Sequence, residues 1–216
     1  MKIKIFALTH KKFEVPQDKM YQPLQVGREE KEDLGYLCDN TGDNISAENC
    51  YYSELTGLYW IWKNVHTYKY VGTCHYRRYL LNEQEKIFTE AEYLELLKDY
   101  DLITTKRVVL NNSYHYGFAT NHNIHALDMT GEVIKELYPE YYDTFVQLVN
   151  GTETYFAEML KKRPDVLMEA SDITGELKLS MQIIATMDQE LQRMGHCYLR
   201  KENRFRELIT LFTKKI

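Results

Sequence analysis

The chain has 216 residues, 44% of them hydrophobic and 27% charged, a composition that suits one folded domain and excludes wholesale disorder. Its net charge of −5 argues against a protein that coats nucleic acid. No apolar run approaches the roughly 20 residues of a membrane span, and the apolar start is too short for a signal peptide. The four cysteines lack paired spacing, which favours free thiols and a cytoplasmic location.

The first expected strand covers residues 2–8, which alternate charged and apolar side chains. A loop follows at residues 9–12, and residues 13–49 form a long, loop-rich connection with several Pro and Gly residues. Connections of this length without regular structure are usually functional. Ser46 is expected to cap a helix over residues 48–64, whose apolar positions are spaced for one buried face.

The second half of the chain alternates strands with helices. A second strand is expected over residues 70–74, and a capping box at Thr89 opens a helix that ends near Asp99. The other expected elements are short strands within 101–110 and helices over 123–138, 139–149, 177–193 and 203–214. This order predicts an α/β fold with a mainly parallel sheet, in a single domain over residues 1–216.

Residues 70–79 are the most informative stretch, because cations and tyrosines are crowded just after an expected strand. Arginine forms bidentate bonds with phosphate and stacks on planar groups. In a parallel sheet ligands bind at the carboxyl ends of the strands, where the loops after Leu8 and Cys74 would both lie. One site is therefore expected from Thr9, His10, His75, Tyr76, Arg77 and Arg78. The alternative is an edge strand with a solvated basic turn.

Three carboxylates are further candidates. Asp39 and Asp43 lie in a turn cluster that lacks the ligand spacing of a calcium loop, so a contact with a ribose or sugar hydroxyl competes with a plain turn. Glu54 lies on the expected aromatic helix, where it is either solvated or paired with Arg77 or Arg78. Such a pair would be structural as easily as catalytic.

A group of histidines follows later in the chain. His122 and His125 would share one face of the expected helix, and Asp128 continues that face. Because no HExxH motif or cysteine partner accompanies them, a contact between His122 and substrate is favoured over a zinc site, beside the alternative of a solvated histidine. Motifs of nucleophilic hydrolases and nucleotide-binding glycine loops are missing.

Several strings resemble a family of uncharacterised domains encoded in bacterial capsular and exopolysaccharide gene clusters, some of whose members are assigned as galactofuranosyl- or related glycosyltransferases. The resemblance covers about residues 1–160 and rests on residues 2–12, 25–27, 39–46, 52–64, 70–79 and 127–141. It implies a glycosyltransferase type-A-like fold, a nucleotide-sugar donor and a polysaccharide acceptor.

The chain departs from that pattern in two places. Many enzymes of this fold carry a metal-binding Asp-x-Asp where this chain has His75, Tyr76, Arg77 and Arg78. The departure argues against a requirement for Mn²⁺ or Mg²⁺ and favours cationic stabilisation of the diphosphate, so no cofactor and no metal ligand is expected. From about residue 160 the sequence is divergent or shortened relative to the family.

These features predict a cytoplasmic, membrane-peripheral glycosyltransferase that moves a hexosyl unit, galactofuranosyl or galactosyl, from a UDP-sugar to a polysaccharide or lipid-linked glycan, with no nucleic-acid partner. Thr9 and His10, with Asp39 or Asp43, would contact the nucleoside. His75, Arg77 and Arg78 would offset the diphosphate charge, and Asp128 would deprotonate the acceptor hydroxyl. Tyr76, Glu54 and His122 complete the expected substrate-binding set.

Two other functions compete with this one. The first is a non-catalytic nucleotide-sugar or carbohydrate-binding module whose C-terminal catalytic part has eroded. The second is a hydrolase with paired carboxylates.

Overall fold

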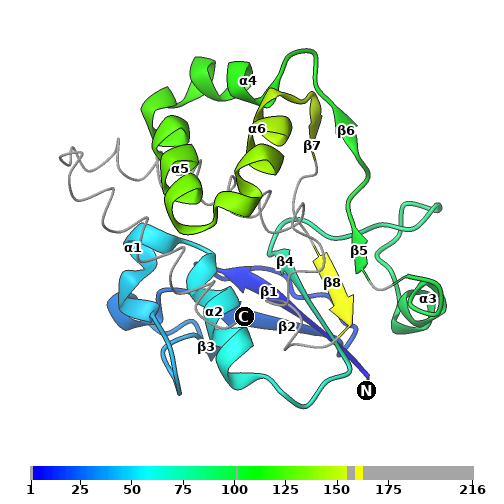
Figure 1. Cartoon of the computed structure of the whole chain (residues 1–216). Helices are drawn as coiled ribbons and strands as arrows, with labels where there is room; N and C mark the ends of the chain where they lie inside the picture. Colours follow the sequence, from blue (N-terminus) through cyan, green and yellow to red (C-terminus); the bar gives the residue numbers. More distant parts are fainter. Residues whose placement is uncertain (1, 101, 155–158, 163–216) are drawn as a thin grey trace. The chain divides into compact units, whose positions relative to one another are not determined.

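A computed structural model describes residues 2–100, 102–154 and 159–162 (Figure 1). The chain forms two compact units. Of the described residues, the first unit comprises 2–100, 102–106 and 159–162, and the second comprises 107–154. The single domain expected over residues 1–216 stays a prediction, since two compact units can belong to one domain.

The first unit is built on a six-stranded sheet of order β3-β2-β1-β4-β8-β5. Strands β3, β2, β1 and β4 run parallel, and β8 pairs antiparallel with both β4 and β5. The strands are β1 (Ile3–Thr9), β2 (Tyr21–Gln25), β3 (Leu37–Cys38), β4 (Tyr70–His75), β5 (Leu102–Thr104) and β8 (Met159–Lys162). The prediction of an α/β fold with a mainly parallel sheet is confirmed.

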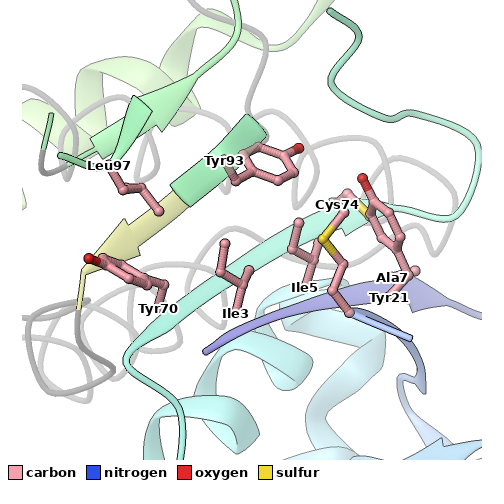
Figure 2. Packing of buried hydrophobic residues seen from close by; sticks show 9 residues of the cluster. Ile3, Ile5, Ala7, Tyr21, Tyr70, Cys74, Tyr93 and Leu97 are labelled. Carbon is pink, nitrogen blue, oxygen red and sulfur yellow. The ribbon is translucent and has the colours of Figure 1, made fainter. Parts of the chain in front are cut away.

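Strand β1 is buried along its whole length, because both faces of the sheet are covered. On one face its alternate residues pack under helix α3 (Glu90–Leu96). Figure 2 shows this cluster, which contains Ile3, Ile5, Ala7, Met20, Tyr21, Tyr70, Cys74, Tyr93 and Leu97. The period of two that places these residues on one face follows from strand geometry.

Helix α2 (Leu55–Asn64) covers the other face. Phe6 and Leu8 of β1 pack there with Trp60 and Ile61. Gly57 allows this close approach, because a Cβ atom added to it would lie 2.7 Å from a methyl carbon of Val26. Helix α2 therefore depends on a residue without a side chain at its contact with the sheet.

Strand β2 was not expected from the sequence. It lies within residues 13–49, where Pro23 and the nearby glycines indicated a loop. Pro23 nevertheless aligns with Ala7 in the parallel pairing of β2 with β1. The rest of this connection contains β3 and the short 3₁₀ helices η1 (Arg28–Glu30) and η2 (Ser46–Glu48).

The helix expected over residues 48–64 is interrupted. Its first part is helix α1 (Asn49–Tyr52), which ends at Ser53 with a positive φ of 48°, and α2 begins at Leu55. Ser46 does not cap this helix: its hydroxyl oxygen accepts from the backbone N–H of Glu29, and Glu48 is the N-cap of α1. The prediction of one continuous helix capped by Ser46 is therefore wrong.

Other local predictions of the first unit are confirmed. Strand β4 runs from Tyr70 to His75, one residue longer than expected. Thr89 and Glu92 form both hydrogen bonds of the capping box at the start of α3. The helix ends at Leu96 and not near Asp99, and β5 lies within the expected segment.

In the described part of the second unit, three α-helices pack on one another. Its described elements are β6 (Val108–Val109), α4 (Tyr114–Asn121), α5 (Ile124–Leu137), η3 (Pro139–Tyr141), α6 (Tyr142–Asn150) and β7 (Glu153–Thr154). Strands β6 and β7 pair antiparallel. The buried side chains of the helices are Phe118, Leu127, Val133, Ile134, Phe145 and Val149.

The helices expected over 177–193 and 203–214 lie outside the described residues. Within the described part of the chain, every helix is too short or too polar to cross a bilayer.

Replacing Gly57 by Ala tests the contact between α2 and the sheet. Overpacking costs about 1–3 kcal/mol and exceeds the gain of roughly 1 kcal/mol in helix propensity, so a net loss of about 1 kcal/mol in unfolding free energy is expected. Gly117→Ala in α4 is the matched control, because no atom lies within 4 Å of its added Cβ. Urea unfolding followed by far-ultraviolet circular dichroism measures both. Equal gains in stability for the two variants would contradict the close approach.

Candidate functional site

Two loops lie side by side at the carboxyl ends of β1 and β4. The strands pair in parallel, with Leu8 opposite His75. Beyond the pairing, the backbone N–H of Tyr76 donates to the carbonyl oxygen of Leu8 at 3.2 Å. The loop that begins at His10 and the loop that begins at Tyr76 therefore start from adjacent points, as the sequence predicts for a parallel sheet.

Tyr76 stands at the centre of the aromatic contacts between these loops. Its side chain is buried, and its ring centroid lies 4.3 Å from that of His75 and 5.5 Å from that of His10. Phe13 packs against it at 5.7 Å. The Tyr76 hydroxyl has no hydrogen-bond partner within the described part of the chain. A buried polar group left unpaired is uncommon in proteins and often marks a functional site.

The same ring holds two cations. The Nζ atom of Lys11 lies 5.5 Å from the ring centroid of Tyr76, and the guanidinium carbon of Arg77 lies 5.1 Å from it. Arg78 follows on the same loop. All three side chains are exposed, and none forms a salt bridge with any described residue. Among the described residues the site therefore presents an excess of positive charge, with the carboxylate of Glu54 near Arg78. Lys11 was not among the expected site residues, although it follows the expected first strand.

His75 is neutral in this environment. Burial first, and then the charges of Arg77 and Arg78, lower the pKa of His75 to about 4. Its Nδ1 atom accepts a hydrogen bond from the backbone N–H of Arg77 at 3.2 Å, so the ring carries its proton on Nε2. Burial and neighbouring cations also lower the pKa of His10. Without a bound anion, the positive charge at neutral pH therefore comes from Lys11, Arg77 and Arg78. The predicted role of His75 in offsetting a diphosphate charge stays a prediction.

Glu54 faces His75 from the start of α2. Its Oε1 atom lies 3.9 Å from Nε2 of His75, and its side chain is 52% exposed. Burial raises the pKa of Glu54, and the charge of Arg78 opposes this rise. The structure thus brings Glu54 into the site, as a neighbour of both His75 and Arg78.

Thr9 fixes the start of the first loop. Its side chain is buried, and its hydroxyl donates to the carbonyl oxygen of Lys11 at 2.5 Å. The N–H of Lys11 donates back to the same hydroxyl at 3.1 Å. The Thr9 hydroxyl is therefore engaged in a turn that positions Lys11, while its predicted contact with a nucleoside stays a prediction.

Asp39 is a buried hub and has no exposed surface. Its carboxylate accepts hydrogen bonds from four donors in three segments of the chain. These are the backbone N–H groups of Gly27 and Arg28 and the hydroxyls of Ser46 and Thr56, at 2.6–3.1 Å. Asp39 therefore holds the long connection against α2, and no atom of its side chain is free to contact a nucleoside as predicted.

Asp43 lies on the surface. It accepts a hydrogen bond from the hydroxyl of Tyr59 at 3.0 Å and forms an ion pair with Lys63 at 3.8 Å. Its predicted contact with a ribose or sugar stays a prediction.

The later histidines are arranged differently from the prediction. His122 ends α4 in an extended conformation, and Asn123 caps the next helix, so His122 and His125 do not share a helix face. Asp128 is exposed and lies 3.9 Å from His125. The roles predicted for His122 and Asp128 stay predictions. Across the described residues, no group of three potential metal ligands comes together.

Comparison with known proteins assigns the family. Residues 4–194 match the sequence profile of a domain of unknown function, DUF4422, and the chain belongs to that family. The match extends beyond residue 160, where the motif resemblance ends. No curated protein matches the chain significantly.

One solved structure supports the assignment of the fold. The chain is similar to the apo structure of the bifunctional glycosyltransferase WbbM, with a TM-score of 0.69 and 23% sequence identity. The similarity covers 98% of this chain and 43% of that chain, so this chain spans less than half of that protein. The fold is the glycosyltransferase type-A-like fold that the sequence resemblance implies.

Replacing Asp39 by Asn tests the buried hub. Losing a charged acceptor with four donors is expected to lower the unfolding free energy by roughly 2–4 kcal/mol. Asp43→Asn is the matched control and should cost less than about 1 kcal/mol, because its contacts are exposed. Guanidinium unfolding followed by the fluorescence of Trp60 and Trp62 measures both. Equal losses would contradict the structural role of Asp39.

The lowered pKa of His75 predicts acid sensitivity. Between the ordinary histidine pKa of 6.5 and the folded value of about 4, the unfolded chain binds a proton that the folded one does not. Stability is therefore lost as the pH falls from about 7 to about 5, by roughly 2 kcal/mol from this group. His75→Gln should remove that part of the pH dependence, as measured by unfolding at each pH. An unchanged dependence would show that His75 titrates normally.

Proposed function

We propose that the protein is a glycosyltransferase that uses a nucleoside-diphosphate sugar. The observation that carries this proposal is the cluster formed by Lys11 and Arg77, which lie against the buried ring of Tyr76, and by Arg78, the next residue on the same loop. The cluster lies at the carboxyl ends of two parallel strands, and its cations form no salt bridge with the described residues.

The chemistry of the leaving group explains the need for these cations. When the glycosidic bond to phosphate breaks, about one further negative charge develops on the diphosphate, and fixed positive groups stabilise it. Arginine is suited to this role because its planar fork matches two phosphate oxygens. Two arginines and a lysine would supply the charge that a bound metal supplies elsewhere. We therefore propose that transfer needs neither Mn²⁺ nor Mg²⁺.

The similarity of fold to WbbM, described as a bifunctional glycosyltransferase, supports the same class of reaction. As donor we propose a UDP-hexose, with a galactofuranosyl or galactosyl unit. As acceptor we propose a polysaccharide or lipid-linked glycan, reached at the cytoplasmic surface of the membrane.

Arg77→Ala and Arg78→Ala test the assignment of the cations. Each change should weaken the binding of UDP by about 10–100-fold, because each removes a charge-assisted contact with phosphate. Binding of uridine, which lacks phosphate, should change far less. Calorimetric titration of both ligands measures the difference. Arg107→Ala is the control, since Arg107 is equally a surface arginine but is paired with Glu153.

Three results of binding and turnover measurements would contradict the proposal. Equal losses for UDP and uridine would remove the arginines from the phosphate site. A strict requirement for Mn²⁺ in turnover would contradict cationic stabilisation. Binding of UDP-sugars without release of UDP, with a panel of glycan acceptors, would favour a non-catalytic binding module.

A further inference from the structure

Glu54 is a carboxylate of the site that accepts no hydrogen bond from the described residues. Among the described residues, no hydrogen-bond donor reaches its oxygens, and its recorded neighbour is Nε2 of His75 at 3.9 Å. The other carboxylates of this region are occupied: Asp39 accepts four hydrogen bonds and Asp43 accepts one from Tyr59. Glu54 is thus a half-exposed acid that no described donor satisfies, beside a cluster of exposed cations.

The backbone before Glu54 is held in a strained conformation. Ser53 has φ 48° and ψ −126°, a region that residues other than glycine rarely occupy. Such a residue costs of order 1–3 kcal/mol and persists only where its surroundings fix it. The side-chain amide of Asn49 donates to the Ser53 carbonyl oxygen at 2.6 Å, and Thr56 connects the same turn to the buried Asp39. Strain of this kind is concentrated at functional sites.

The break at Ser53 determines where Glu54 lies. It separates α1 from α2 and places Glu54 at the first position before α2, where its oxygen approaches His75 of β4. The hydrogen bonds to Asp39 therefore fix the position of Glu54 as well as that of the long connection.

The neighbours of Glu54 act on its proton affinity in opposite directions. His75 is neutral and lies 3.9 Å from the carboxylate, while the positive charge of Arg78 lowers the pKa of Glu54. Burial raises the pKa of Glu54, which brings it closer to the range in which a carboxylate is an effective base.

We propose that Glu54, and not Asp128, accepts the proton of the acceptor hydroxyl during sugar transfer. This inference rests on the glycosyltransferase function proposed above. In the step, the acceptor oxygen forms a bond to the anomeric carbon of the donor, and the bond from that carbon to the diphosphate oxygen breaks. The electron pair of the broken bond stays on the diphosphate, beside Lys11, Arg77 and Arg78. The proton of the hydroxyl moves to the Glu54 carboxylate.

The test compares Glu54→Gln with wild type in the full chain. Glutamine keeps the shape of the side chain but cannot accept the proton. The assay follows UDP release from UDP-galactofuranose and UDP-galactose with a panel of oligosaccharide acceptors, and calorimetry measures UDP affinity. The expected result is a fall in kcat of about 100–1,000-fold, with the Kd for UDP changed by less than about threefold.

Two further variants sharpen the result. Glu54→Asp keeps the base but retracts it, so it should retain more activity than Glu54→Gln. Glu95→Gln is the matched control, because Glu95 is an exposed glutamate of α3 that pairs with Lys98, and the kcat of this variant should equal that of wild type. The acid limb of the kcat–pH profile should be present in wild type and absent in Glu54→Gln.

The outcomes separate this inference from the proposed function. If wild type releases UDP and Glu54→Gln keeps its kcat and its acid limb, the role of Glu54 as base is overturned while the function stands. A loss of UDP affinity as large as the loss of kcat would make Glu54 a binding residue and overturn the inference. A large fall in kcat for Asp128→Asn, without one for Glu54→Gln, would identify Asp128 as the base. No UDP release by wild type with any donor or acceptor would overturn both proposals.

Discussion

The carboxylate of Asp39 is the interaction on which the site most depends. It collects donors from residues 27–28, from Ser46 and from Thr56, which are far apart in the sequence. A buried charge is costly unless it is fully hydrogen-bonded, and here four donors satisfy it. One side chain thus joins the end of β2, the long connection and the start of α2. The position of Glu54 next to His75 follows from that junction.

The charge of the site is the reverse of the charge of the protein. The whole chain carries −5, yet the loops at the ends of β1 and β4 carry three exposed cations that form no salt bridge with the described residues. The net charge of the chain therefore bears on its solubility and does not indicate the charge of its ligand. Burial is the main cause of the low pKa of His75, and the charges of Arg77 and Arg78 lower it further.

Many of the strands and helices could be predicted from the sequence because the patterns that indicate them are local. The alternation in β1 and the capping box at Thr89 each act within a few residues. Strand β2 was missed because Pro23 indicates a loop, and only pairing with β1 makes the segment a strand. The break at Ser53 was missed for a similar reason, since its unusual backbone is held by Asn49, Thr56 and the distant Asp39. The grouping of the two loops was predictable from parallel topology, whereas the burial of Asp39 and the neutrality of His75 depend on tertiary contacts.

The ring of Tyr76 has a consequence for the thermodynamics of recognition. It keeps two like charges near each other without a ligand, since the electron-rich face of an aromatic ring attracts cations. The contacts therefore favour conformations in which Lys11 and Arg77 lie beside the ring before an anion arrives. Long basic side chains usually lose rotamer entropy when they close on a ligand, and that loss reduces affinity. A cation–π contact at an exposed site contributes about 0.5–1 kcal/mol, so it offsets part of this loss before binding.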